Sequence, residues 1–103
     1  MELNFFLRIS FHKNDNDKPF VLIYDTTAFE DFITLNHLDP QFISVHDKIK
    51  IDDVEYEVTS LDLKLNNYLR KYEKNSETSM YDRTDPADYN CELQVYVKDI
   101  MKN

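Results

Sequence analysis

Glycine is missing altogether from the 103 residues of this chain. Phosphate-binding loops, the dinucleotide-binding fingerprint and the nucleophile elbow of hydrolases all depend on glycine, which permits positive φ and close backbone approach to a ligand. The sequence therefore excludes these three kinds of site, and with them most nucleotide-dependent and hydrolase families.

Cysteine and long apolar runs are also scarce. Cys91 is the single cysteine, so an intramolecular disulfide is excluded. The longest apolar run, Phe20 to Tyr24, is far shorter than the roughly 20 residues of a membrane-spanning helix. Glu2 and Asn4 interrupt the first apolar stretch, so we expect no secretory leader. These features predict a reducing, cytoplasmic setting and no membrane partner.

The charge of the chain has mostly one sign. It holds 20 acidic and 12 basic side chains, which gives a net charge of −8. Such a surface repels nucleic-acid phosphates and anionic lipids, so we expect no direct binding to nucleic acid. The apolar share of 42% and the charged share of 31% are those of a globular protein, and residues 1–103 suit a single domain.

Alternation of apolar and polar residues predicts a half-buried strand near each end of the chain. In residues 3–12 the odd positions are apolar, and Phe6 is an aromatic ring on the otherwise polar face. From Cys91 to Val97 the odd positions are again apolar, and Tyr96 lies among the polar even positions. The continuous apolar run at 20–24 indicates a strand that is covered on both faces.

One helix is predicted after these first strands. Thr27 and Glu30 have the spacing of a capping box, in which two side chains satisfy free N–H groups at a helix start. Apolar residues then share one helical face, and Pro40 prevents the helix from continuing. We expect a short helix over about residues 28–36.

Four carboxylates fall within six positions of the stretch IKIDDVEYEV, residues 49–58. A hairpin with a two-residue turn at Asp52 and Asp53 explains them, because opposite charges then face each other on one side and apolar residues on the other. The expected pairs are Ile51 with Val54, Lys50 with Glu55, Ile49 with Tyr56, and Lys48 with Glu57. This consistency favours a turn and a solvated face over a metal or acid–base site.

The apolar pattern changes after this hairpin. Beyond Val58 the apolar parity shifts from even to odd, which predicts a β-bulge or sharp bend near Thr59 and Ser60. Apolar spacing of the type i, i+3, i+4, i+7 then predicts a second short helix over about 66–74. Residues 73–90 carry no period and predict a long polar loop.

These elements predict an α+β fold. We expect a small, five-stranded, mainly antiparallel sheet or partly open barrel, with one or two short helices. The element order also resembles a β-grasp roll, in which the last strand lies parallel beside the first. This resemblance is one of topology, and topology alone does not give a function.

No constellation of catalytic or metal-binding residues stands out. The histidines at 12, 37 and 46 lack the spacing of a zinc site, and Cys91 has the parity of a core residue. Residues 15–26 lack the ligands and the glycine of a calcium loop. No serine lies in a recognisable nucleophile motif. We therefore expect a protein without catalytic activity, metal or cofactor.

The remaining signals favour binding to another protein or to a second copy of the chain as a homodimer. Phe6 and Tyr96 are aromatic rings on polar faces, and they form a contact patch if the first and last strands are neighbours. In the alternative arrangement, residues 66–90 fold over that face and bury both rings.

Two further functions stay open. The chain could act as an acidic decoy from a mobile element, which imitates nucleic-acid phosphates and blocks a nucleic-acid-binding protein. Such a decoy needs carboxylates in rows, and Asp25, Glu30 and Asp31 lie in a stretch without lysine or arginine. The second alternative is an enzyme whose signature is not recognised.

Overall fold

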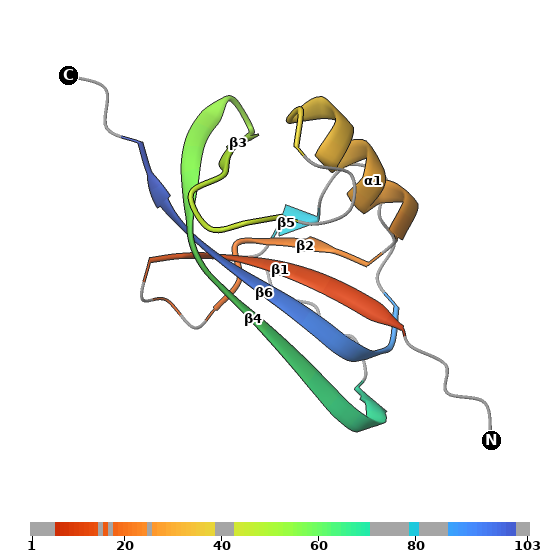
Figure 1. The fold of residues 1–103 in the computed structure, drawn as a ribbon. Coiled ribbons are helices and arrows are strands. Elements are labelled where there is room, and N and C mark those ends of the chain that lie inside the picture. The colour runs from red at the N-terminus through yellow and green to blue at the C-terminus, as the bar shows by residue number, and fades with distance from the viewer. Residues whose placement is uncertain are drawn as a thin grey trace.

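The computed structural model describes residues 6–14, 16, 18–24, 26–38, 43–70, 79–80 and 87–100. These residues form a mixed sheet and one helix (Figure 1). The strands and helix are β1 (Leu7–Lys13), β2 (Val21–Ile23), α1 (Thr26–Leu35), β3 (Lys48–Ile51), β4 (Val54–Arg70), β5 (Ser79–Met80) and β6 (Tyr89–Asp99).

The sheet has the strand order β3-β4-β6-β1-β2-β5. Its antiparallel neighbours are β3–β4, β4–β6 and β1–β2, whereas β1–β6 and β2–β5 are parallel. The α+β prediction is confirmed, but the expectation of a mainly antiparallel sheet is corrected to a mixed one. Parallel neighbours need a crossover connection, and the chain between β1 and β6 supplies it through α1 and the β3–β4 hairpin.

The sheet curves into a half-barrel, with α1 against one face (Figure 1). A five-stranded core of β3, β4, β6, β1 and β2 is extended by the two-residue β5. β1 and β6, the first and last strands, are parallel neighbours, as expected for the β-grasp-like alternative. β5 lies inside the predicted loop 73–90, and residues 71–78 and 81–86 are outside the described part of the chain.

The β3–β4 hairpin has the predicted turn and register. Asp52 and Asp53 have φ of 51° and 66°, which is the left-handed conformation that a two-residue type I′ turn requires. Lys48, Lys50 and the two isoleucines pair with the residues expected of them. Aspartate adopts positive φ more readily than most residues other than glycine, and it provides this turn in a chain without glycine.

The end of α1 also has a residue other than glycine at positive φ. His37 has φ of 56°, and its N–H donates to the Thr34 carbonyl at 3.1 Å. The N–H of Leu38 donates to the Ile33 carbonyl at 3.1 Å. These two bonds form a Schellman motif, which usually places glycine in the left-handed position. The helix thus ends at a defined turn before Pro40, which lies outside the described residues.

The predicted bulge lies at Thr59. Val58 pairs with Val97 and Ser60 pairs with Tyr96, so Thr59 is the extra residue. Its hydroxyl donates to the Tyr96 carbonyl at 3.1 Å. Before the bulge, the even positions of β4 lie on the core face of the sheet. After it, the odd positions lie on that face.

The predicted helix over 66–74 is wrong in its described part. β4 continues as a strand through Arg70, which pairs with Tyr89 after a second shift in register. The local apolar spacing suits a helix, but backbone pairing with β6 overrides this weak preference. Residues 71–74 lie outside the described part of the chain.

The hydrophobic core lies between one sheet face, α1 and the hairpin. The rings of Phe11 in β1 and Phe32 in α1 are fully buried, with their centroids 5.1 Å apart. Val58 of β4 and Val95 of β6 are also fully buried. The core is therefore concentrated toward the α1 end of the sheet. Among the described residues, no helix has the length and apolar content to cross a membrane.

Candidate protein-binding face

The far half of the sheet, away from the hairpin, has an apolar and a polar face. Three cross-strand rows of apolar residues run from β4 through β6 to β1 on the face that also contacts α1. These rows are Leu61–Val95–Phe11, Leu63–Leu93–Ile9 and Leu65–Cys91–Leu7. The face is therefore continuous with the hydrophobic core.

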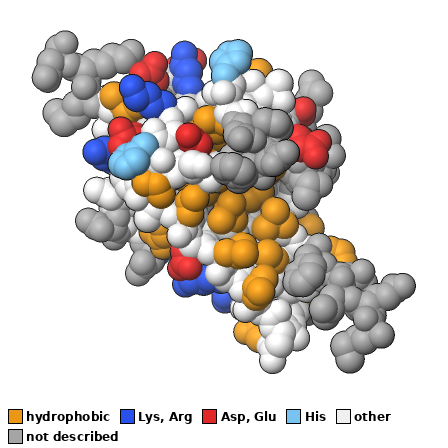
Figure 2. Space-filling view, viewed as in Figure 1, with side chains coloured by type: hydrophobic (Ala, Val, Ile, Leu, Met, Phe, Trp, Pro, Cys, Tyr) orange, Lys and Arg blue, Asp and Glu red, His pale blue; other side chains and the backbone are white. Residues whose placement is uncertain are grey.

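Burial decreases along these rows from β1 to β4. Ile9 and Phe11 are fully buried, whereas Leu63 and Leu65 have exposed fractions of 58% and 63%. We call Leu61, Leu63 and Leu65 the leucine strip. Figure 2 shows hydrophobic side chains gathered on this side of the molecule, below the position of α1 in Figure 1. The helix covers one end of the apolar face, where Leu61 is partly buried against the core, and leaves Leu63 and Leu65 open.

Exposed apolar residues continue beyond the strip. Tyr68 and Leu69 are 63% and 48% exposed near the end of β4. They belong to the segment that the sequence predicted as a helix. Successive side chains of a strand point to opposite faces, so only one of these two residues can lie on the face of the leucine strip.

One edge of β4 is open over the same region. β3 pairs with β4 only from Val54 to Glu57. At the next residue, Val58 accepts from the His46 N–H at 2.8 Å and donates to the Asp47 carbonyl at 2.9 Å. From Thr59 onward, no strand of the described part of the chain pairs with β4 on the side opposite β6. Unpaired backbone groups on a strand edge can hydrogen-bond to another strand.

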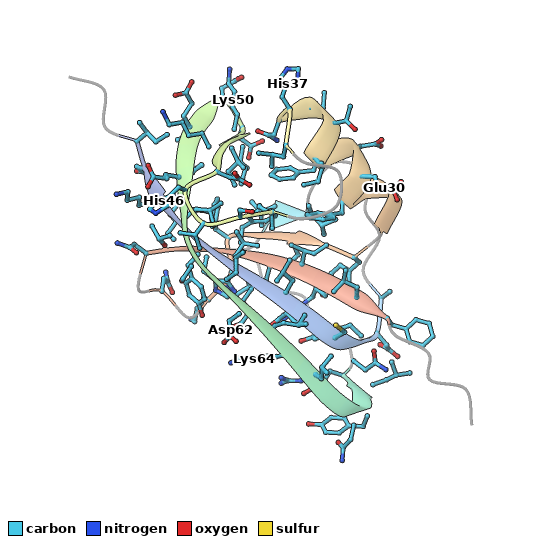
Figure 3. The ribbon with its side chains drawn as sticks, in the orientation of Figure 1. Glu30, His37, His46, Lys50, Asp62 and Lys64 are labelled. Atoms are coloured by element: carbon cyan, nitrogen blue, oxygen red, sulfur yellow. The ribbon has the colours of Figure 1, made fainter. Side chains whose placement is uncertain are left out.

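Asp62 and Lys64 alternate with the leucines on the polar face of β4. Both are exposed, and Figure 3 shows both along the outer edge of this strand. The ion pairs found among the described residues include neither of them. Next to the open edge, β4 therefore carries one carboxylate and one ammonium group, separated by Leu63, that form no ion pair with the described residues.

The opposite face of the sheet contains a buried polar cluster, which we call the arginine cluster: Arg8, Tyr24, Tyr89, Glu92 and Gln94. Arg8 forms an ion pair with Glu92 and donates to the Tyr24 hydroxyl at 3.2 Å. Its guanidinium lies 4.0 Å from the centroid of the Tyr89 ring. Gln94 donates to the other Glu92 oxygen at 2.8 Å.

Burial acts on the pKa values of this cluster. It lowers the pKa of Arg8, but the Tyr24 hydroxyl and the Glu92 charge more than offset it and leave that pKa raised. Burial also raises the pKa of Tyr89. Every buried side-chain nitrogen and oxygen of the described residues has a hydrogen-bond partner. This satisfied network therefore has the properties of a structural element.

The structure separates the two predicted aromatic contacts. β1 and β6 are neighbours, but their parallel register pairs Tyr96 with His12, at the end of β1 opposite Phe6. The Tyr96 ring stacks on His12 with centroids 4.8 Å apart. Phe6 is 49% exposed, and its N–H donates to the Asn90 side chain at 2.8 Å. The two rings do not form one patch, and their roles in binding stay predictions.

The predicted acidic surface is only partly described. Glu30 and Asp31 are exposed on α1, and Figure 3 shows Glu30 projecting away from the sheet. Asp25 lies outside the described residues. Charges of both signs lie close together around the hairpin, where Lys50 is 3.9 Å from Asp53. Among the described residues, no three histidine, cysteine or acidic side chains gather closely enough to hold a metal ion.

The sequence contained a signal for the leucine strip. Three leucines alternate with Asp62 and Lys64 directly after the bulge, which is the pattern of a strand with one apolar face. The exposure of that face depends on where α1 lies, and this is not visible in the sequence. No protein-family model, curated protein or solved structure matches this chain. The geometry of the face therefore carries the functional argument.

Proposed function

We propose that this protein is a non-enzymatic protein-binding module. Its contact surface is the leucine strip together with the open edge of β4. The supporting observation is the exposure of Leu63 and Leu65 on a face whose other residues form the core. Soluble monomers rarely leave a large contiguous apolar surface uncovered, and such surfaces often mark interaction sites.

The combination of an apolar face and an open edge suits a partner segment in the extended conformation. Such a segment would continue the sheet through backbone hydrogen bonds, and its alternate side chains would lie on the leucine strip. Its polar face would meet Asp62 and Lys64, which favours a segment of mixed charge. The proposed occupant is therefore a β-strand with alternating apolar and charged residues.

Site-specific photo-crosslinking in cells tests this proposal. A photoreactive residue in place of Leu65 should form a covalent adduct with a polypeptide, and Leu63→Asp in the same chain should abolish that adduct. The matched control carries the photoreactive residue in place of Asp31, which is exposed on α1. Equal adduct from both positions, or an adduct that Leu63→Asp leaves unchanged, would show that the leucine strip is not the contact surface.

A further inference from the structure

We propose that the partner strand is β4 of a second copy of this chain, paired antiparallel with a two-fold axis at Leu63. This inference rests on the proposed function, because it uses the same face and the same edge. A two-fold dimer requires a surface that complements itself. The open part of β4 meets this requirement in its charges and in its length.

The charges of β4 select one register. Residues that face each other across an antiparallel pair lie on the same side of the sheet. With the axis at Leu63, Asp62 of each copy lies opposite Lys64 of the other, and Leu61 lies opposite Leu65. With the axis at Asp62, two aspartates meet, and with the axis at Lys64, two lysines meet. Like charges directly opposite each other are destabilising.

The length of the open edge accommodates the same register. The backbone of residues 46–47 closes the edge at Val58, so the free segment begins at Thr59. A two-fold axis at Leu63 pairs Thr59 with Asn67 of the second copy. This places residue 68 of the second copy beside residues 46–47, where the free edge ends. The paired segment 59–67 would be roughly 30 Å long at 3.3–3.4 Å per residue.

The resulting dimer would remove the open edge of β4 and cover part of the exposed surface of the leucine strip. The two sheets would join into one continuous sheet, which removes the open edge of β4 in each copy. The two leucine strips would lie side by side on one face, with Leu63 of both copies at the centre. On the other face, Asp62 and Lys64 would gain ionic partners that the described residues of the single chain do not provide.

Charge reversal tests the register on the purified full-length chain, with association measured by sedimentation equilibrium. The unaltered chain should dimerise, and either Asp62→Lys or Lys64→Asp should weaken the dimer by about tenfold or more, because two attractive pairs become repulsive. Combining both substitutions in one chain should restore dimerisation. An equimolar mixture of the two single variants should form a heterodimer, since each copy then supplies the charge that the other needs.

Glu30→Lys provides the matched control, because it reverses an exposed acid on α1 and should leave association unchanged. A dimer that tolerates both single reversals, or that the combined reversal fails to restore, would overturn this register. A chain that stays monomeric at all concentrations would overturn the second copy as the partner. If the photo-crosslink at Leu65 then joined a different polypeptide and still required Leu63, the proposed function would stand without this dimer.

Discussion

Two groups of residues in the far half of the sheet are buried in the reverse of the usual order: the charged pair of β1 and β6 on the polar face, and the leucines of β4 on the apolar face. On the polar face, Glu92 has an exposed fraction of 7%, and the Arg8 side chain has one of 15%. On the apolar face, Leu63 and Leu65 are 58% and 63% exposed. Buried charges are tolerated when they are paired and hydrogen-bonded, as they are in the arginine cluster. The described residues leave more than half of the Leu63 and Leu65 surface exposed.

This difference separates a face that completes the fold from a face that still has apolar area to bury. The arginine cluster already satisfies its polar atoms within one chain, so a partner would gain little by contacting it. The leucine strip still exposes apolar area, and burial of such area is favourable by about 25 cal/mol per Å². The following predictions test whether stability belongs to one face and association to the other.

The largest effect is expected in the arginine cluster. Glu92→Ala should lower the free energy of unfolding by about 3–5 kcal/mol, because it leaves the buried Arg8 charge without its carboxylate. Urea denaturation measures this loss. Glu57→Ala is the control, since Glu57 pairs with the half-exposed Lys98 and should contribute less than about 1 kcal/mol. Equal losses in the two variants would show that the cluster is not a structural element.

The ion pair between Arg8 and Glu92 also predicts that replacing both residues restores stability. A chain with both Arg8→Met and Glu92→Leu should recover much of the stability that Glu92→Ala loses, because no buried charge is then left alone. The measurement is the same urea denaturation. A double variant as unstable as Glu92→Ala would instead indicate that packing around Arg8 dominates.

The next largest effect on stability is expected within one cross-strand row, where a buried and an exposed residue can be compared. Ile9→Ala should cost about 2–5 kcal/mol, because it opens a cavity in the core. Leu63→Ala lies in the same row but removes side-chain atoms that are largely exposed, so it should cost less than about 1 kcal/mol in the monomer. Thermal and urea unfolding at low protein concentration give both values. A large loss from Leu63→Ala would place the leucine strip within the core.

The sequence predicted the hairpin half of β4 better than the far half. The turn at Asp52 and Asp53 and the bulge at Thr59 follow from local alternation and from charge pairing between near neighbours. The far half was predicted as a helix from residue 66, because local spacing does not show that β6 pairs with this segment. Pairing between distant strands is a property of the whole fold, and it decided the outcome here.

The site was predicted only in outline. Binding through an exposed apolar surface was expected, but at Phe6 and Tyr96, because the sequence does not give the register of β1 against β6. Arg8 and Glu92 are separated by 84 positions, so no local pattern links them. The exposure of the leucine strip depends on α1 covering only one end of the sheet. Each of these features arises from contacts between segments that are distant in the sequence.

The smallest effect on the free energy of unfolding should appear at alkaline pH. It involves one titrating group on each face of the sheet. Burial raises the pKa of the Cys91 thiol on the apolar face and that of the Tyr89 hydroxyl on the polar face. Above the unfolded-state pKa of each group, the unfolded chain loses a proton that the folded chain keeps. The free energy of unfolding should therefore fall as the pH rises, from about pH 9 for Cys91 and about pH 10 for Tyr89.

Urea denaturation between pH 7 and 10.5 would separate the two contributions. Cys91→Ala should remove the part of the decline that begins near pH 9 and leave the later part, whereas Tyr89→Phe should do the reverse. Cys91 also lies in the row of Leu65, at the border between the covered and the open parts of the apolar face. A decline near pH 9 that persists unchanged in Cys91→Ala would show that Cys91 does not cause it, and that burial does not hold a proton on this thiol.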